Sequence, residues 1–164
     1  MARILLLFFI ILLIPGTSVS SQDDLLKIVA SIKPKVIRQG MEGELSIKIL
    51  PIQGIKIASN PDIRINLLKN ENIQFSKVFF TGSELDFKTI QEDNLVYYDF
   101  ETEEDGKIIS FKVNDTSLIG KQKLNGEVVF TATFKDKWSI KTFQKFSVEF
   151  ISARSRIKKK KQFN

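Results

Sequence analysis

The sequence of 164 residues contains neither cysteine nor histidine. Thiol nucleophiles, disulfide bonds, the usual ligands of zinc, copper and iron, and the commonest general base are therefore excluded. The sequence also lacks a nucleophile-elbow motif, a phosphate-binding glycine loop and a dinucleotide-binding fingerprint. We expect a protein that is not an enzyme and that binds no cofactor or metal ion. Catalysis by Asp, Glu, Lys or Ser alone is the remaining alternative, but no carboxylate pair can be placed in a common cleft from sequence.

The N-terminal residues have the pattern of a secretory signal peptide, assigned to residues 1–21. Arg3 supplies a positive charge, residues 4–14 are an unbroken apolar run, and small residues follow up to an expected cleavage point after Ser20 or Ser21. A retained membrane anchor is the alternative, but this run is shorter than the ~20 residues of a spanning helix. No later segment is apolar enough to span. We therefore expect a periplasmic or secreted protein without a transmembrane segment after cleavage.

The formal net charge of +6 comes from the C-terminus. Without Arg3 and residues 154–164, the chain has 18 basic and 19 acidic residues, so we expect no specific nucleic-acid binding by the body of the protein. Residues 154–164 are predicted to be a disordered tail. This tail is either a solvated terminus or a contact to an anionic lipid or polymer. Its basic residues are Arg154, Arg156, Lys158, Lys159, Lys160 and Lys161.

Apolar and polar residues alternate through most of residues 22–153, for example at Leu45, Ile47 and Ile49. A period of two residues indicates half-buried β-strands, and no window of helical length has a period of 3.6. The pattern predicts an all-β fold, an immunoglobulin-like antiparallel β-sandwich of about eight to nine strands in one domain. The expected strands are residues 27–33, 45–49, 63–67, 74–81, 95–101, 107–113, 126–134, 139–143 and 146–150.

An acidic stretch spans residues 99–106 (DFETEEDG). Its carboxylates have enough oxygen atoms to hold a hard cation such as calcium. The alternative is a hydrated hairpin turn at Asp105-Gly106, between the strands expected on either side. We favour the hairpin.

Three segments resemble one known family. They are residues 124–150 (LNGEVVFTATFKDKWSIKTFQKFSVEF), residues 49–67 (ILPIQGIKIASNPDIRINL) and residues 38–45 (RQGMEGEL). They are similar to the N-terminal periplasmic domain of the thiol:disulfide interchange protein DsbD family, over most of residues 28–151. The resemblance implies an immunoglobulin-like fold whose last hairpin docks other periplasmic proteins. Thr133 and Trp138 match the family's two cysteines, so thiol exchange is excluded at these positions.

The last expected hairpin holds the candidate docking residues Thr133, Lys135, Lys137 and Trp138. Residues 135–137 read as a polar surface turn, after which Trp138 opens the return strand. A single Trp in an all-β domain commonly packs in the core, and we favour this arrangement. An exposed Trp138 at the hairpin tip would instead be a plausible interface anchor.

These features lead to two hypotheses about function. The first is a non-catalytic protein-binding or structural module of the bacterial envelope, which engages a protein partner through sheet edges or the Trp138 hairpin. The alternative is an envelope-surface association protein, held to an anionic lipid or polymer by its basic tail. A salt-sensitive interaction that is lost when residues 154–164 are deleted would identify the second.

Overall fold

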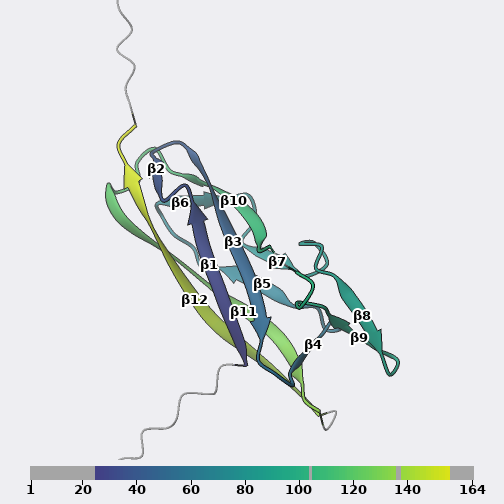
Figure 1. Cartoon of the computed structure of the whole chain (residues 1–164). Coiled ribbons are helices and arrows are strands. Elements are labelled where there is room, and N and C mark those ends of the chain that lie inside the picture. Colours follow the sequence, from purple (N-terminus) through teal and green to yellow (C-terminus); the bar gives the residue numbers. More distant parts are fainter. Residues whose placement is uncertain (1–24, 104, 136–137, 156–164) are drawn as a thin grey trace, which may run out of the picture.

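The computed structural model describes residues 25–103, 105–135 and 138–155, and all regular secondary structure in these ranges is β-strand (Figure 1). The described residues form twelve strands, more than the eight to nine expected. The predicted signal peptide and residues 156–164 lie outside the described ranges. The strands are β1 (Leu26–Lys33), β2 (Val36–Arg38), β3 (Glu42–Pro51), β4 (Lys56–Ala58), β5 (Arg64–Leu67), β6 (Ile73–Phe75), β7 (Phe79–Thr81), β8 (Thr89–Glu92), β9 (Leu95–Tyr98), β10 (Lys107–Val113), β11 (Gly120–Thr133) and β12 (Ser139–Ala153).

The strands form two sheets, which confirms the predicted β-sandwich. The first sheet has the order β1-β3-β10-β6, and the second has the order β2-β12-β11-β4-β9-β8, with β5 beside β11 and β7 beside β5. The first sheet corresponds to the A-B-E-D sheet of an immunoglobulin domain, and β5, β11 and β12 correspond to strands C, F and G of the other. One detail of the prediction is wrong. The second sheet is mixed rather than antiparallel, because β2 pairs with β12 in parallel.

Alternating apolar residues build the core between the two sheets. Leu45, Ile47 and Ile49 of β3 are at most 1% exposed, and the opposing sheet contributes every second residue of β11 and, from Phe146 to Ser152, of β12. The rings of Phe111 and Phe150 meet across the sandwich with their centroids 5.7 Å apart. Because the chain has no disulfide bond, this apolar burial supplies most of the stability.

Three of the expected strands are divided or merged in the structure. Residues 74–81 form β6 and β7 rather than one strand, because β6 pairs with β10 in the first sheet and β7 pairs with β5 in the second. The chain therefore crosses between sheets at this point. Conversely, residues 139–143 and 146–150 belong to the single strand β12.

Two dipeptides that are typical of turns do not form hairpins here. Asn-Gly is such a turn signal, but Asn125-Gly126 lies within β11, where an added Cβ on Gly126 would be 2.4 Å from the Phe146 ring. Gly126 is thus required by close packing and not by a turn. Asp105-Gly106 is not a hairpin turn. It lies between β9 and β10, and these two strands belong to different sheets.

Replacing Ile47 with Ala should lower the free energy of unfolding by about 2–5 kcal/mol, because it leaves a cavity in the core. Ile108→Ala on the neighbouring strand is the matched control. Ile47 is fully buried, whereas Ile108 is 59% exposed, so the control should cost about 1 kcal/mol or less. Urea unfolding of both variants measures the difference, and equal losses would show that the strand faces are assigned wrongly.

Candidate functional site

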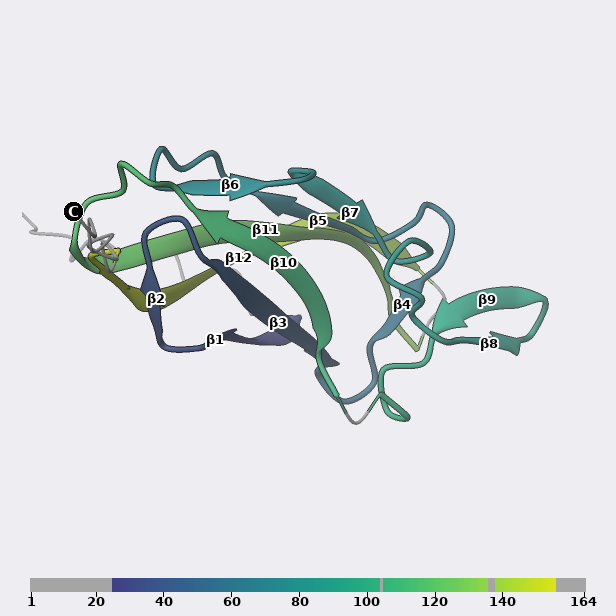
Figure 2. The same cartoon turned by 90° about the horizontal axis from the view of Figure 1, so that it is seen from above.

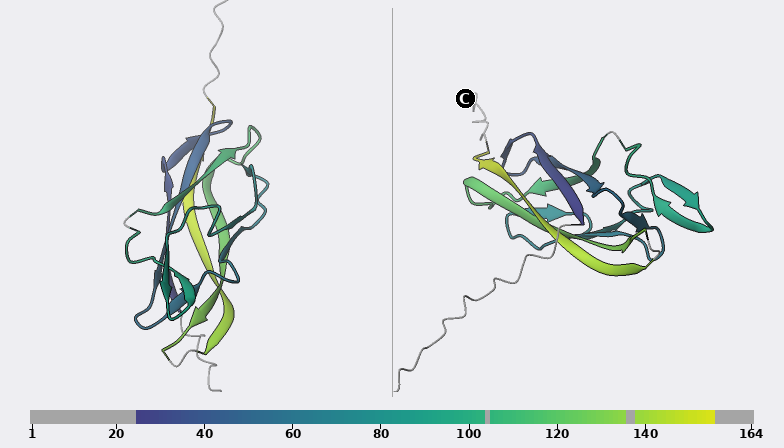
Figure 3. Two further views of the ribbon diagram at one scale, coloured as in Figure 1. Left: turned by 90° about the vertical axis from the view of Figure 1, so that its right-hand side faces the viewer. Right: turned by 60° about the horizontal axis from the view of Figure 1, so that its bottom comes forward.

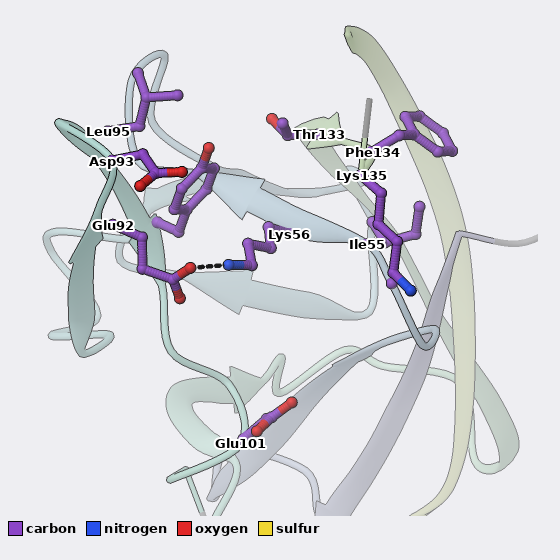
Figure 4. A pocket seen from close by; sticks show the side chains of 11 residues that line it. Ile55, Lys56, Glu92, Asp93, Leu95, Glu101, Thr133, Phe134 and Lys135 are labelled. Atoms are coloured by element: carbon purple, nitrogen blue, oxygen red, sulfur yellow. Dashed lines mark hydrogen bonds and ion pairs between the residues drawn. The ribbon is translucent and has the colours of Figure 1, made fainter. Parts of the chain in front are cut away.

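A pocket of about 380 Å³ lies at the end of the sandwich where β4, the β8–β9 hairpin and the end of β11 meet (Figure 4). One wall carries Ile55 and Lys56, and the wall across from it carries Leu95 and Tyr97 of β9. Phe134 and Lys135, which follow β11, complete the lining together with Gly54, Glu92, Asp93, Glu101 and Thr133. Its lining is therefore mixed, with apolar and aromatic side chains beside five charged ones.

The β8–β9 hairpin projects from the sandwich and forms the outer wall of the pocket (Figure 2). Asp93 and Asn94 both have positive φ angles, 49° and 64°, as the two-residue turn of a twisted hairpin requires. The Lys56 ammonium group pairs with Glu92 and lies 5.4 Å from the centroid of the Tyr97 ring. Hydrogen bonding to Glu92 raises the pKa of Lys56 above its usual 10.5.

The tip of the β11–β12 hairpin presents an aromatic pair beside this pocket. Trp138 stacks on Phe134 with ring centroids 3.9 Å apart and an angle of 5° between the planes. Trp138 is 52% exposed, so our expectation that it packs in the core is wrong. At this end of the hairpin residues 139–141 of β12 are exposed, whereas Ala132 and Thr133 of β11 are buried, so Trp138 lies on the exposed side of the hairpin. Trp138, Phe134, Lys135 and Ile55 line an open hollow next to the pocket.

The other predicted docking residues have different environments. Thr133 is buried, and its hydroxyl group lies 2.9 Å from that of Ser139, which closes the hairpin. Thr133 is therefore a structural residue whose side chain lines the pocket only in part. Lys135 is exposed at the pocket rim. Lys137 lies outside the described residues.

A buried hydrogen-bond cluster supports the strand that carries Tyr97. The hydroxyl group of Tyr98 donates to Asp62, which also accepts hydrogen bonds from the Gly82 amide at 3.1 Å and the Ser83 hydroxyl at 2.8 Å. Partial burial raises the pKa of Asp62, but these hydrogen bonds outweigh it and hold the pKa below its usual 3.8. Burial and the Asp62 contact raise the pKa of Tyr98 to about 12.

The acidic stretch has its own partners in the protein. Asp99 accepts a hydrogen bond from the Thr102 hydroxyl at 2.9 Å, and Glu103 pairs with Lys107 at 3.0 Å. Burial raises the pKa of Glu103, but hydrogen bonds from Lys107 and the Lys88 amide lower it overall. Residue 104 is not described. Among the described residues, no group of three or more carboxylates is placed to hold a metal ion.

The C-terminal end of β12 lies at the opposite end of the molecule from the Trp138 hairpin (Figure 3). Arg154 follows β12 and is exposed, whereas Arg156, Lys158, Lys159, Lys160 and Lys161 lie outside the described residues. Within the described ranges, no helix is long and apolar enough to cross a bilayer.

Comparisons with known proteins add a similarity of fold. No protein-family model and no curated protein matches this chain. A variant of BcpA, the major pilin subunit of Bacillus cereus, matches 79% of this chain with 9% identity and a TM-score of 0.39. This chain spans about 40% of the length of that pilin chain.

Two shorter solved structures are similar over nearly their whole length. A chain of a type I cohesin–dockerin complex from Clostridium thermocellum has 17% identity and a TM-score of 0.34, with 77% of this chain and 99% of that chain covered. Murine CRIg has 8% identity and a TM-score of 0.29, with 77% and 98% covered. At these values the matches carry no argument about function.

Sequence reasoning missed most of the pocket. Ile55, Lys56, Leu95 and Tyr97 are brought together only by the pairing of β4 with β9 and with β11. One signal was available in the sequence. Asp93-Asn94 stands between two short runs with β-branched and aromatic residues, a pattern typical of a tight hairpin.

The Asp62 cluster predicts a dependence of stability on pH. Because the folded-state pKa of Asp62 lies below its ordinary value, its contribution is complete above pH 3.8 and is lost as the pH falls through the folded-state pKa. Asp62→Asn should therefore be less stable at neutral pH and lose less stability on acidification. Urea unfolding between neutral pH and about pH 2 measures this. Parallel pH profiles of the two proteins would show that the cluster does not hold Asp62 ionised.

Proposed function

We propose that this chain is a non-catalytic protein-binding module of the bacterial envelope, exported by its N-terminal signal peptide. The observation that carries the proposal is the half-exposed Trp138, stacked on Phe134 at the mouth of a pocket. We call the surface formed by Ile55, Leu95, Phe134, Lys135 and Trp138 the hairpin-end surface.

The physical properties of this surface favour a protein partner. Tryptophan is enriched among the residues that contribute most to interface affinity, because its large ring buries much apolar area. Stacking on Phe134 already fixes the Trp138 ring, so binding costs less side-chain entropy. Leu95, 49% exposed, and Ile140, 39% exposed, add apolar area nearby, and Lys135 supplies a charged rim.

The resemblance to the N-terminal domain of the DsbD family supports the same proposal. In that family the last hairpin carries the docking site, and here the corresponding hairpin carries Trp138. Thr133 and Trp138 have no thiol group, so the proposed role is binding without thiol exchange. This part of the argument rests on similarity of sequence and fold.

Association through the basic tail is the second candidate function. Arg154 lies at the far end of β12 from Trp138. With a rise of about 3.3 Å per residue, the two ends of β12 are roughly 45 Å apart. The two contacts can therefore be removed separately by mutation.

In-cell cross-linking with tagged mature protein tests the proposal. We expect the full chain to capture a defined protein partner, and Trp138→Ala to reduce capture at least about tenfold, as loss of an interface anchor does. Phe79→Ala is the matched control. Phe79 is 49% exposed but belongs to β7, away from the hairpin-end surface, so its loss should leave capture unchanged.

A truncation after Ala153 separates the two candidate functions. Capture that survives Trp138→Ala but is lost on truncation, and that fades with added salt, would replace the hairpin proposal by tail association. Equal capture by all variants would contradict both.

A further inference from the structure

The second sheet ends in a long strand whose outer edge has little pairing. Strand β12 pairs with β11 along fourteen residues, from Ser139 to Ser152. On its other side, the described residues pair with it only at Ile151–Ala153, through β2. Strand β1 lies alongside but forms no ladder with β12, and the Leu26 amide donates to the side chain of Gln144 instead. We call residues 139–149 on this side the β12 edge.

Hydrogen bonds at the C-terminal end of β12 show which backbone groups face this edge. The Ile151 amide donates to Lys35, and the Ala153 carbonyl group accepts from Gln39, both across the outer side. Because the peptide direction alternates along a strand, the other odd-numbered residues point their N–H and C=O groups the same way. The β12 edge therefore presents these groups of Ser139, Lys141, Phe143, Lys145, Ser147 and Glu149.

The side chains around the β12 edge are mainly basic. On the outer face of the β11–β12 pair, Lys121, Lys123, Lys141 and Lys145 are opposed by Glu127 and Glu149. Glu149 is already paired with Lys121 at 3.0 Å, and Glu127 accepts a hydrogen bond from Asn66 at 2.9 Å. Lys145 lies across from Glu127 in the strand pairing, and its ammonium group is 5.9 Å from the centroid of the 53% exposed Phe143 ring. Neither Lys141 nor Lys145 forms an ion pair with a carboxylate of the described residues.

We propose that the β12 edge binds an extended, acidic segment of a partner protein, which adds to the second sheet as a further strand. Its backbone would pair with the odd-numbered residues of β12. Its carboxylates would lie opposite Lys141 and Lys145, and an apolar side chain would cover Phe143. This surface is separate from the hairpin-end surface, and the proposal does not depend on a role for Trp138.

The same charges oppose pairing with a second copy of this chain. Two β12 edges in antiparallel contact would be adjacent strands about 4.8 Å apart. Lys141 and Lys145 of one copy would then lie close to the same lysines of the other copy. Like charges at this spacing destabilise a strand pair, and lysine on an edge strand is a common protection against self-association. An acidic strand in the same place would instead be attracted by Lys141 and Lys145.

Two synthetic peptides of about eight residues test the proposal, one alternating valine with glutamate and the other alternating valine with lysine. Titration of the mature protein with each labelled peptide, followed by fluorescence anisotropy, gives the two affinities. We expect the acidic peptide to bind at least about tenfold more tightly, with an affinity that falls as salt is added. Lys141→Glu with Lys145→Glu should reverse the preference.

Phe143→Pro and Phe143→Ala distinguish strand addition from simple charge attraction. Both remove the ring, but only proline removes the N–H group that faces the edge, and it leaves the pairing with β11 intact. We expect Phe143→Pro to bind the acidic peptide at least about tenfold more weakly than Phe143→Ala. Circular dichroism of both variants checks that they are folded. Trp138→Ala should not change the affinity, so failure of this proposal is separable from failure of the hairpin proposal.

Three results would overturn the proposal: no binding of either peptide, equal binding of both, or equal effects of Phe143→Pro and Phe143→Ala. Sedimentation of the mature protein tests the alternative occupant. A dimer that Phe143→Pro dissociates and Phe143→Ala does not would show that the edge pairs with a second copy.

Discussion

The unbroken antiparallel ladder between β11 and β12 is the interaction on which the rest of the structure depends. Its fourteen residue pairs contain no bulge, and side chains alternate between buried and more exposed positions along residues 121–132 of β11 and residues 145–152 of β12. Strands β4 and β5 attach to the free side of β11, and β2 attaches to the end of β12. Because the chain has no cysteine, no disulfide bond connects the two sheets, and this ladder and the apolar core beneath it hold them together.

The length of this strand pair explains where the candidate sites lie. Near Ser152 both strands cover the core, but residues 139–141 at the other end of β12 are exposed in succession, whereas Ala132 and Thr133 of β11 opposite them are buried. Phe134 follows this buried end of β11 and packs partly against the core, and the exposed Trp138 stacks on it beside the pocket formed with β4 and β9. On its outer side β12 has no ladder partner among the described residues over residues 139–149.

Alternation in the sequence was enough to predict the fold class and the strands with one buried face, such as β3 and β10. It also located Thr133, Lys135 and Trp138 on one hairpin. It failed for Trp138, because a period of two residues tells which face a side chain occupies but not whether that face is covered at that position. It failed for Gly126, whose role is contact with the Phe146 ring. The pocket could not be predicted, because Lys56, Tyr97 and Phe134 meet only through long-range strand pairing.

Hydrogen exchange of individual amides in β12, measured by NMR, tests most directly whether this strand is paired with β11 along its whole length and unpaired on its outer side. A continuous ladder with β11 protects the even-numbered amides from Ile140 to Phe150, whereas an unpaired outer edge leaves the odd-numbered amides from Lys141 to Glu149 open to solvent. We predict this alternation, and we expect the odd-numbered amides to be protected only from Ile151 onward, where β2 pairs with β12. Uniform protection along β12, or protection that ends in the middle of the strand, would contradict it.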